Sequence, residues 1–318
     1  MEFSPARALL LFLDGVGIGS SDPRVNPVAA AHLPTFDRLL GGRGPLLGEP
    51  GSEAAAARFA AVDACLGVDG LPQSGTGQTS LLAGVNAARL IGRHFGPWVH
   101  TGLRELLARD NLLSRARRAG RSAAFANAYP AAFLKRSSAG LLRRPAAPPF
   151  AASAAGVLTR NETDLRAGNA VASEIEHTAW RERLDPTIPL ITPAAAGAVL
   201  ARIASKADVT LFAHYATDTI GHTRELSAGV AAMERVDAFL SGLIEQMPAD
   251  LLLVVASDHG NIEDVTAAHT RNTVPLIAIG PGADDVVTGV QSIAQVAPVL
   301  LRLLGIDREE PAHRVEPI

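Results

Sequence analysis

The chain contains short runs in which every residue is apolar, and each run stops at a turn. One run, Ala8–Leu13, ends at Asp14-Gly15 and predicts a strand over residues 7–13. Two more, over residues 251–256 and 274–279, end at Ser257-Asp258-His259-Gly260 and at Gly280-Pro281-Gly282. Strands without polar alternation are buried on both faces, as in a parallel sheet that is covered by helices. These runs therefore favour one architecture above all others.

Segments with helical spacing of apolar residues lie between and around these strands. They cover residues 33–40, 79–90, 225–247 and 291–304, and a further strand is predicted over residues 208–213. Strands that alternate with helices are typical of α/β proteins. The sequence thus predicts a mostly parallel sheet covered by helices on both faces, in which ligands bind at the carboxyl ends of the strands.

The middle of the chain differs in composition from the two ends. Residues 91–205 are rich in Arg, Ala and Pro, with a loop predicted at residues 143–149. We expect a core domain made of residues 1–90 and 206–318, with residues 91–205 inserted as a smaller cap lobe. The basic residues of this segment have two interpretations, a solvated helical surface or a lobe that offers cations to an anionic substrate.

Composition excludes several classes of protein. The net charge of −3 argues against an electrostatic grip on nucleic acid, and 4% aromatic residues argue against a stacking surface for single strands. The single cysteine, Cys65, rules out a disulfide framework. The longest N-terminal apolar run is far shorter than the roughly 20 residues of a membrane-spanning helix. We therefore expect a cytoplasmic protein with no membrane partner, while the sequence holds no signal for its oligomeric state.

Polar residues that bind metals follow the predicted strands. Asp14, Asp258 and the region of Asp218 come directly after strands, which places three carboxylates at one edge of the sheet. The whole set of three Asp, three His and one Ser is Asp14, Ser74, Asp218, His222, Asp258, His259 and His269. Carboxylate oxygens and imidazole nitrogens are ligands of Zn²⁺ and Mn²⁺. Two divalent ions need about six or seven protein ligands, which this set provides.

Each of these residues also has an ordinary structural explanation when it is taken alone. Asp14 suits a turn, Asp218 with His222 suits a capped helix start, and His269 suits a satisfied polar residue. Asp258-His259 is harder to explain, because an acid and an imidazole after a buried strand are costly unless they are used. Chance is a poor explanation for the full combination in this order.

The same residues resemble the alkaline phosphatase superfamily, and most closely its branch of cofactor-independent phosphoglycerate mutase and phosphopentomutase. The motifs that carry the resemblance are Leu13-Asp14-Gly15-Val16-Gly17, Ser74-x-x-Gly77 running into Ser80–Gly84, Asp218-x-x-Gly221-His222, Asp258-His259-Gly260-Asn261 and His269-Thr270-x-x-x-Val274-Pro275-Leu276. The segment Ser292–Leu301 fits as well. The resemblance covers residues 5–86 and about 206–306 and leaves the middle segment without a motif.

The resemblance implies two divalent metal ions, Mn²⁺ or Zn²⁺, and a role for each ligand. One ion would take Asp218, His222 and His269. The other would take Asp14, Asp258, His259 and the hydroxyl of Ser74. Ser74 would be the nucleophile that becomes phosphorylated, because it lies ten residues before Gly84. Thr76 is the rival nucleophile, two residues later in a Gly-rich loop.

Several residues are expected to touch the substrate. Gly75 and Gly77 would let backbone amides approach the phosphoryl oxygens, and Gln78 would donate a hydrogen bond. In the middle segment, the cationic residues expected to bind the anionic end of the substrate are Arg93, His94, Lys135 and Arg136.

The resemblance implies phosphoryl transfer through a phosphoserine on a small phosphorylated metabolite, of mutase type. A phosphatase, phosphodiesterase or phosphonate-processing hydrolase is the alternative that the same site supports. A non-catalytic metal-binding protein is disfavoured, because all seven ligand positions hold usable residues. Two departures put phosphoglycerate in doubt as the substrate: the middle segment has only about 115 residues, and position 78 is Gln where the mutases usually have His.

Overall fold

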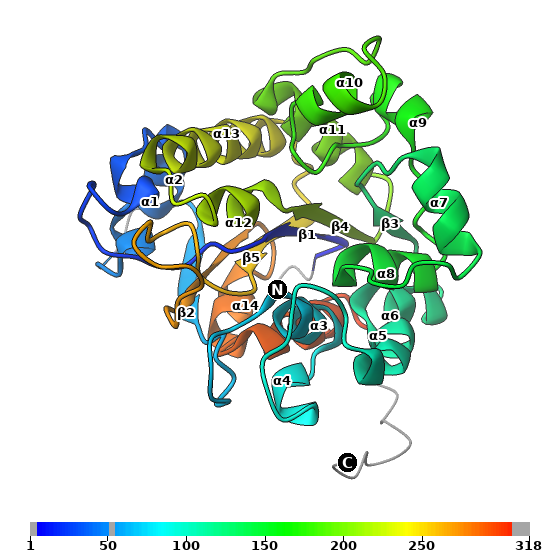
Figure 1. The fold of residues 1–318 in the computed structure, drawn as a ribbon, viewed down its shortest axis with the longest axis horizontal. Helices are drawn as coiled ribbons and strands as arrows, with labels where there is room; N and C mark the ends of the chain where they lie inside the picture. Colours follow the sequence, from blue (N-terminus) through cyan, green and yellow to red (C-terminus); the bar gives the residue numbers. More distant parts are fainter. Residues whose placement is uncertain (1–4, 51–54, 307–318) are drawn as a thin grey trace.

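The computed structural model describes residues 5–50 and 55–306, which form a single six-stranded sheet with helices on both sides (Figure 1). The strands are β1 (Arg7–Leu13), β2 (Arg58–Val62), β3 (Ala123–Phe125), β4 (Val209–His214), β5 (Leu251–Ser257) and β6 (Val274–Ile279). Their order across the sheet is β2-β6-β5-β1-β4-β3. β6 pairs antiparallel with both β5 and β2, while β3, β4, β1 and β5 are mutually parallel. The predicted mostly parallel sheet is confirmed.

The helices follow the order of the chain and cover both faces of this sheet. They are α1 (Pro27–Ala30), α2 (Pro34–Leu40), α3 (Ser74–Ala83), α4 (Ala87–Leu90), α5 (Arg104–Asp110), α6 (Leu112–Arg118), α7 (Ala131–Ser138), α8 (Ala147–Ala154), α9 (Glu162–Arg166), α10 (Thr178–Arg183), α11 (Pro193–Ala204), α12 (Ala216–Gly221), α13 (Leu226–Glu245), α14 (Ala283–Gly289) and α15 (Val296–Leu303). Short 3₁₀ turns occupy Gly44–Leu47, Thr101–Leu103 and Ile293–Gln295.

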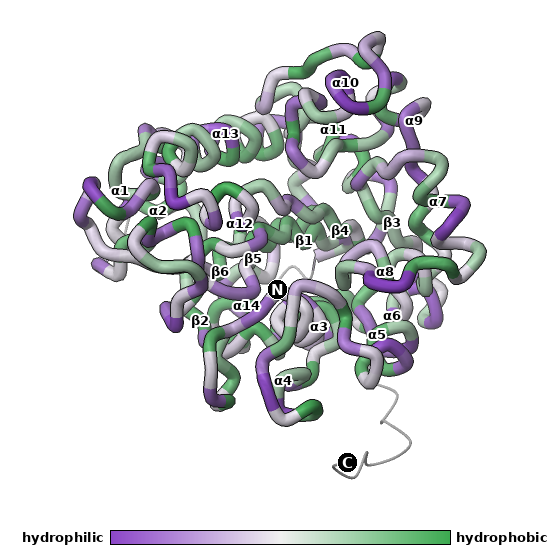
Figure 2. Tube along the Cα trace, in the orientation of Figure 1, coloured by the Kyte–Doolittle hydropathy of each residue, from purple (hydrophilic) through white to green (hydrophobic). Residues whose placement is uncertain are grey.

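The central strands are buried on both faces, as their apolar sequences predict. Leu10 and Phe12 of β1 point into the core beneath α3 and α15, while Leu9 and Leu11 point into the core beneath α2, α11 and α13. Figure 2 shows the apolar trace of β1, β4 and β5 in the centre of the molecule, with hydrophilic residues on the outer helices and loops. None of the described helices has the length and hydropathy to span a bilayer.

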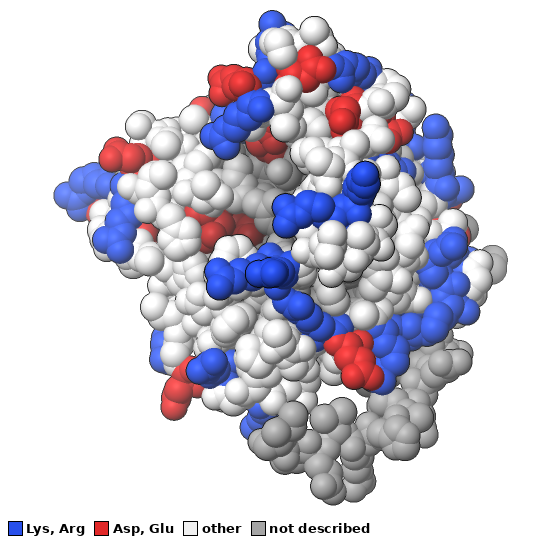
Figure 3. All heavy atoms as spheres, turned by 45° about the vertical axis from the view of Figure 1, so that its right-hand side comes forward, with Lys and Arg blue, Asp and Glu red and all other residues white. Residues whose placement is uncertain are grey.

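The inserted segment is less separate than its composition indicates. β3, which lies within residues 91–205, is an edge strand of the main sheet and pairs with β4. Helices α5, α6 and α8 pack into the core on one face, and α11 packs on the other, because a parallel sheet needs both faces covered. Only residues 128–188 have a small hydrophobic cluster of their own, around Trp180 and Leu165. The cap lobe expected over residues 91–205 stays a prediction, and within it β3 joins the edge of the main sheet. Figure 3 views this side of the molecule, where basic side chains lie beside a hollow.

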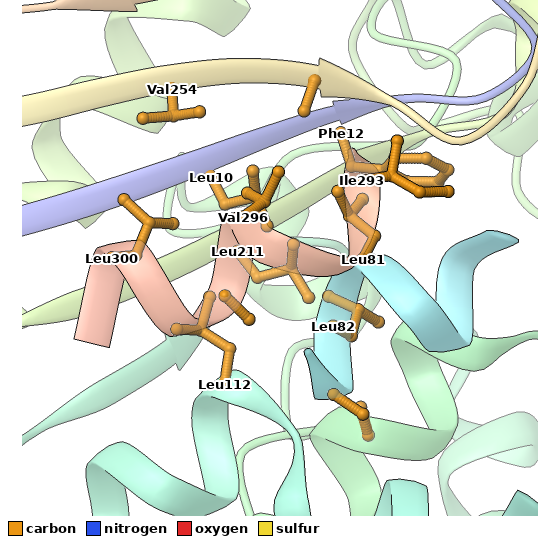
Figure 4. Close-up of a cluster of buried hydrophobic side chains, with 14 of the residues drawn as sticks. Leu10, Phe12, Leu81, Leu82, Leu112, Leu211, Val254, Ile293, Val296 and Leu300 are labelled. Carbon is orange, nitrogen blue, oxygen red and sulfur yellow. The ribbon is translucent and has the colours of Figure 1, made fainter. Parts of the chain in front are cut away.

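The core beneath α3 fixes the helix that begins at Ser74. Leu81 and Leu82 are fully buried, and Figure 4 shows them packed toward Phe12 of β1 and toward Ile293 and Val296. The helical pattern predicted over residues 79–90 is broken in the structure, because Gly84 adopts a left-handed conformation that ends α3. The apolar C-terminal half of α3 thus anchors its polar first turn against the sheet edge.

Candidate metal centre

The carboxyl ends of β1, β4 and β5 meet at one edge of the sheet and carry the acidic residues. Leu13 is paired with His214 on one side and with Ser257 on the other, so the three strands end level with one another. Asp14 and Asp258 follow directly, and Asp218 lies in α12, just after β4. Gly15 has a φ of +69°, and a Cβ there would lie 2.7 Å from a carboxylate oxygen of Asp218. The turn after β1 therefore needs glycine to let these carboxylates approach.

Asp218, His222 and His269 form the first cluster of metal-ligand type. One ligand atom from each lies within 4.8 Å of the others. His269 Nε2 is 3.3 Å from His222 Nε2 and 3.5 Å from Asp218 Oδ1. His269 Nδ1 lies 2.7 Å from the carbonyl oxygen of Pro72, to which it donates when Nε2 is the free nitrogen. This contact aims the Nε2 lone pair at the cluster.

Asp14, Asp258 and His259 form the second cluster, which is fully buried. Their ligand atoms also lie within 4.8 Å of one another. Asp14 Oδ1 and Asp258 Oδ2 are buried without a hydrogen-bond partner among the described residues. Buried carboxylate oxygens are costly unless a cation or a donor satisfies them. A divalent ion bound between these oxygens and the imidazole of His259 fits that need.

The two clusters adjoin through His259. Its Nε2 atom lies 4.0 Å from Asp218 Oδ1, and its ring stacks on that of His269 with centroids 4.0 Å apart. Ser74 Oγ is 3.0 Å from the same Nε2 atom. The structure thus brings together all seven residues that the sequence analysis nominated as ligands.

Burial and neighbouring charges shift the pKa values of the ligand residues. Burial raises the pKa of Asp14 and, together with the charge of Asp14, raises the pKa of Asp258 well above its ordinary value. Burial alone would lower the pKa of His259, but the neighbouring carboxylates of Asp258 and Asp14 outweigh it and raise that pKa to about 10. Burial would raise the pKa of Asp218, but hydrogen bonding to His269 and the charge of His259 lower it to about 2.

Parts of this chain are similar to known proteins. The profile of the Metalloenzyme superfamily matches residues 192–308, which carry five of the seven site residues. The match is to this carboxyl-terminal part of the chain. The chain is also similar to a 2,3-bisphosphoglycerate-independent phosphoglycerate mutase of Syntrophotalea carbinolica, with 37% identity over 125 residues. The alignment covers 36% of this chain and 24% of the mutase, so the chain matches only about a quarter of that relative.

Solved structures extend the likeness to the whole fold. The alkaline phosphatase of the Antarctic bacterium TAB5 has a TM-score of 0.54 at 11% identity, and the match covers 97% of this chain and 100% of that one. The phosphoglycerate mutase of Leishmania mexicana has a TM-score of 0.52 at 14% identity, with 97% of each chain covered. At these identities the likeness concerns the fold alone. Together with the superfamily match, it confirms the resemblance to alkaline phosphatase-like proteins.

The two nucleophile candidates occupy different environments. Ser74 is the first residue of α3 rather than a loop residue, and its hydroxyl faces His259. Thr76 Oγ1 instead lies within hydrogen-bond distance of the carbonyl oxygens of Gln73 and Phe95 and accepts a bond from the Phe95 amide. Thr76 therefore holds the 95–98 loop against α3, and its hydroxyl is engaged with backbone.

The glycines of α3 have a packing role, while their expected approach to phosphoryl oxygens stays a prediction. A Cβ on Gly75 would lie 2.1 Å from the Trp98 carbonyl oxygen, and one on Gly77 would lie 2.9 Å from the Asp258 carbonyl oxygen. Both positions are glycine because neighbouring backbone passes too close for a side chain. Gly75 is thus a contact point for the 95–98 loop.

Gln78 contacts a ligand residue rather than open space for a substrate. Its Nε2 donates to Asp14 Oδ2 at 3.0 Å, and the side chain is buried. That bond leaves Asp14 Oδ1 free to face His259. Gln78 thus positions Asp14 through its amide nitrogen, and its expected contact with the substrate stays a prediction.

The four expected cationic substrate ligands do not contact the metal-ligand residues. His94 Nε2 is 3.2 Å from the Val68 carbonyl oxygen, and the guanidinium of Arg93 lies over the Phe95 ring. Lys135 and Arg136 are exposed on α7, and Arg136 lines a cavity there. Arg93, His94 and Lys135 thus lie outside the two ligand clusters.

Sequence reasoning missed Glu263, a buried carboxylate that ties the ligand segments together. Its Oε2 accepts hydrogen bonds from the backbone amides of Gly17 and Asn261, at 3.0 and 2.7 Å. Its Oε1 accepts from the Thr270 hydroxyl and from Asn272 Nδ2. In the sequence, Glu263 is marked only by its position, five residues after Asp258 and close to the predicted ligands.

The titration of this cluster predicts how the metal-free protein responds to pH. The pKa of about 10 for His259 exceeds its unfolded value of 6.5, so its stabilising contribution is complete below about pH 6.5 and is lost as pH rises through about 10. The raised pKa values of Asp14 and Asp258 act with the same sign. We expect the melting temperature of chelator-treated protein to fall by several degrees between about pH 7 and about pH 10. His259→Gln should flatten this decline, and a flat profile for the unmodified chain would contradict the assignment.

Proposed function

We propose that this protein transfers a phosphoryl group between small phosphorylated molecules through a phosphoserine on Ser74, with two divalent metal ions as cofactors. The observation that carries the proposal is the position of Ser74 Oγ, 3.0 Å from His259 Nε2, an atom that also lies 3.4 and 3.6 Å from carboxylate oxygens without a hydrogen-bond partner among the described residues. A serine hydroxyl is a weak nucleophile that needs a metal or a base to activate it. The site supplies ligands for a metal, and the imidazole of His259 contacts the Ser74 hydroxyl.

Two ligand groups are available for the ions. Asp218, His222 and His269 would hold one, and Asp14, Asp258 and His259 with the Ser74 hydroxyl would hold the other. When bound, such ions lower the pKa of a coordinated hydroxyl and stabilise charge on the attacking and leaving oxygens of an in-line displacement. Zn²⁺ and Mn²⁺ both suit a set of carboxylates and imidazoles.

The residues of the chain fix the reacting geometry. Ser74 lies in the first turn of α3, whose amide dipoles favour negative charge at that end. Its hydroxyl gives up its proton as the oxygen bonds to phosphorus and the ester bond to the substrate alcohol breaks, and the released alkoxide takes up one proton in exchange. The phosphoryl group then passes to another hydroxyl or to water. Gln78 and Glu263 hold the ligand segments in place throughout.

The acceptor separates a mutase-like reaction from hydrolysis. The named relative favours transfer back to an organic hydroxyl, as in a mutase. Hydrolysis is the second candidate, because the side chain of His222 is 49% exposed and the first cluster is open to water in this conformation. A phosphatase, phosphodiesterase or phosphonate hydrolase would use the same centre.

The direct test is turnover by purified protein that has been loaded with Mn²⁺ or Zn²⁺. Phosphorylated metabolites are supplied, and both free phosphate and phosphate isomers are followed. Isomer formation supports the mutase type, and release of free phosphate at the full rate supports the hydrolase. Absence of both from every ester, with the metals bound, would overturn the proposal.

Metal content gives a separate prediction. Chelated protein refilled with Mn²⁺ or Zn²⁺ should bind close to two ions per chain, because each ligand cluster is complete. Asp258→Asn should lose the ion of the buried cluster and retain the other, since Asp218, His222 and His269 are unchanged. Elemental analysis of both proteins measures this. One ion per chain in the unmodified protein would refute a two-metal centre.

A further inference from the structure

A cavity of about 480 Å³ lies between α7, the start of α8 and the segment that joins them. Its lining includes Arg136, Arg143 and Arg144 together with Tyr129 and Phe133, and contains no acidic residue. Figure 3 shows basic side chains gathered beside a hollow on this side of the molecule. The cavity belongs to a part of the chain that neither the sequence motifs nor the superfamily profile covers.

The three arginines are available to a ligand. Among residues 5–50 and 55–306, none of their guanidinium groups forms an ion pair with a carboxylate. Arg144 lies over the Trp98 ring at 5.8 Å from its centroid, which restrains the guanidinium without neutralising it. Arginine binds carboxylate and phosphate through paired hydrogen bonds. The cavity is therefore suited to an anion.

Aromatic rings give the cavity an apolar, planar wall. The rings of Tyr129 and Phe133 are stacked, with centroids 4.6 Å apart and an angle of 26° between their planes. Burial raises the pKa of Tyr129 to about 12, so its phenol stays protonated and adds no negative charge. A stacked pair of this kind accommodates a flat or apolar group better than a fully hydroxylated one.

Two sets of contacts join this cavity to the metal centre. Tyr129 Oη is 3.4 Å from Tyr215 Oη, and the pKa of Tyr215 is raised first by burial and also by the charges of Asp14 and Asp258. On the other flank, the carbonyl oxygen of Trp98 packs against Gly75, next to Ser74. The amide of the following residue, Val99, donates to the carbonyl oxygen of Pro145 in the cavity wall. Residues of the cavity wall are thus linked to the helix that begins at the proposed nucleophile and to the segment after β4.

We infer that this cavity binds the part of the substrate that is not transferred, an apolar or aryl group that carries a second anionic substituent. The inference rests on the proposed phosphoryl transfer, and it names the substrate class for that site. A three-carbon phosphorylated acid would leave most of such a volume empty, because cavities of about 300–1,000 Å³ hold ligands of drug size. Carboxylate and phosphate are the two groups that the arginines would recognise.

Binding of non-transferable phosphonates tests the inference without any turnover. Benzylphosphonate, 4-(phosphonomethyl)benzoate and 1,4-xylylenebisphosphonate share one body and differ in the second anion. Calorimetric titration of the metal-loaded protein should give a Kd at least about tenfold lower for one or both dianionic probes, and their order identifies carboxylate or phosphate. Equal Kd values for all three would overturn the inference.

Two variants assign the preference to the cavity. Arg136→Ala combined with Arg144→Ala should abolish the gain from the second anion and leave benzylphosphonate binding unchanged, since both arginines are exposed and outside the metal-ligand set. Arg117→Ala is the matched control. Arg117 is an exposed arginine on α6. The carboxyl end of this helix lies near the amino ends of β3 and β4, where Arg121 pairs with Asp208. Retention of the tenfold gain in the double variant would overturn the inference.

Turnover separates failure of this inference from failure of the proposed function. Hydrolysis or transfer from methyl phosphate, phenyl phosphate and 4-carboxyphenyl phosphate is measured with the same proteins. Similar kcat/KM values for phenyl and 4-carboxyphenyl phosphate, with equal probe Kd values, would reject the cavity and keep phosphoryl transfer. No turnover of any ester, with the Kd preference intact, would reject phosphoryl transfer and keep an anion-binding cavity.

Discussion

Ser74→Ala should lower kcat by at least about a thousandfold and leave the fold and one metal site intact. Loss of a covalent nucleophile usually costs several orders of magnitude even where binding survives. The hydroxyl contacts His259, and the Leu81–Leu82 packing that anchors α3 does not involve it. Asp218, His222 and His269 are unchanged, so their ion should still bind. Single-turnover rates and elemental analysis measure the two parts of this prediction.

Thr76→Ala is the matched control for Ser74→Ala in the same helical turn. Its hydroxyl bonds only to backbone of Gln73 and Phe95, so its removal should cost about 1 kcal/mol of unfolding free energy and far less activity. Mass spectrometry of protein quenched during turnover should place the phosphate on Ser74. A phosphate on Thr76, or a Ser74→Ala protein with a near-normal rate, would refute the assignment.

The parts of the fold that the sequence predicts are those buried on both faces. β1 and β6 have the predicted bounds, β5 is one residue longer than predicted, and β4 is shifted by one residue. β2 and β3 were not predicted. β2 is an edge strand with Arg58 exposed, and β3 has three residues, so neither carries a long apolar run. Their strand conformation depends on pairing with β6 and β4, which is a tertiary effect.

Some residues of the candidate site could be predicted from the sequence, and others could not. Its ligands could be predicted because strand ends converge at one edge, and because Asp, His and Ser are chemically distinctive. The contact of Gln78 with Asp14 could not be predicted, since it spans 64 positions of sequence. The arginine cavity depends on the path of residues 142–149 beside α7, and a loop of Arg and Pro has no periodicity from which that path can be read.

Glu263→Gln should destabilise the protein by about 3 kcal/mol and weaken metal binding about tenfold to a hundredfold. The carboxylate accepts two hydrogen bonds on each oxygen, and an amide nitrogen at either position would face two donors. Hydrogen bonds to a buried charged group contribute about 1.5–3 kcal/mol each. The donors lie close to the ligands in the sequence. Gly17 is three residues after Asp14, Asn261 is two residues after His259, and Thr270 directly follows His269. Loosening them should misplace both clusters, as loss of supporting contacts does in metal sites.

Urea unfolding and metal titration of the same samples measure both effects. Asp264→Asn is the matched control, because the Asp264 side chain is only partly buried and bonds locally to Thr266. It should change neither quantity by more than about 0.5 kcal/mol. If the carboxylate only fills space, Glu263→Gln should behave like this control, since the two side chains have nearly the same volume. Loss of stability without loss of metal affinity would instead restrict Glu263 to the fold and remove it from the positioning of Asp14, His259 and His269.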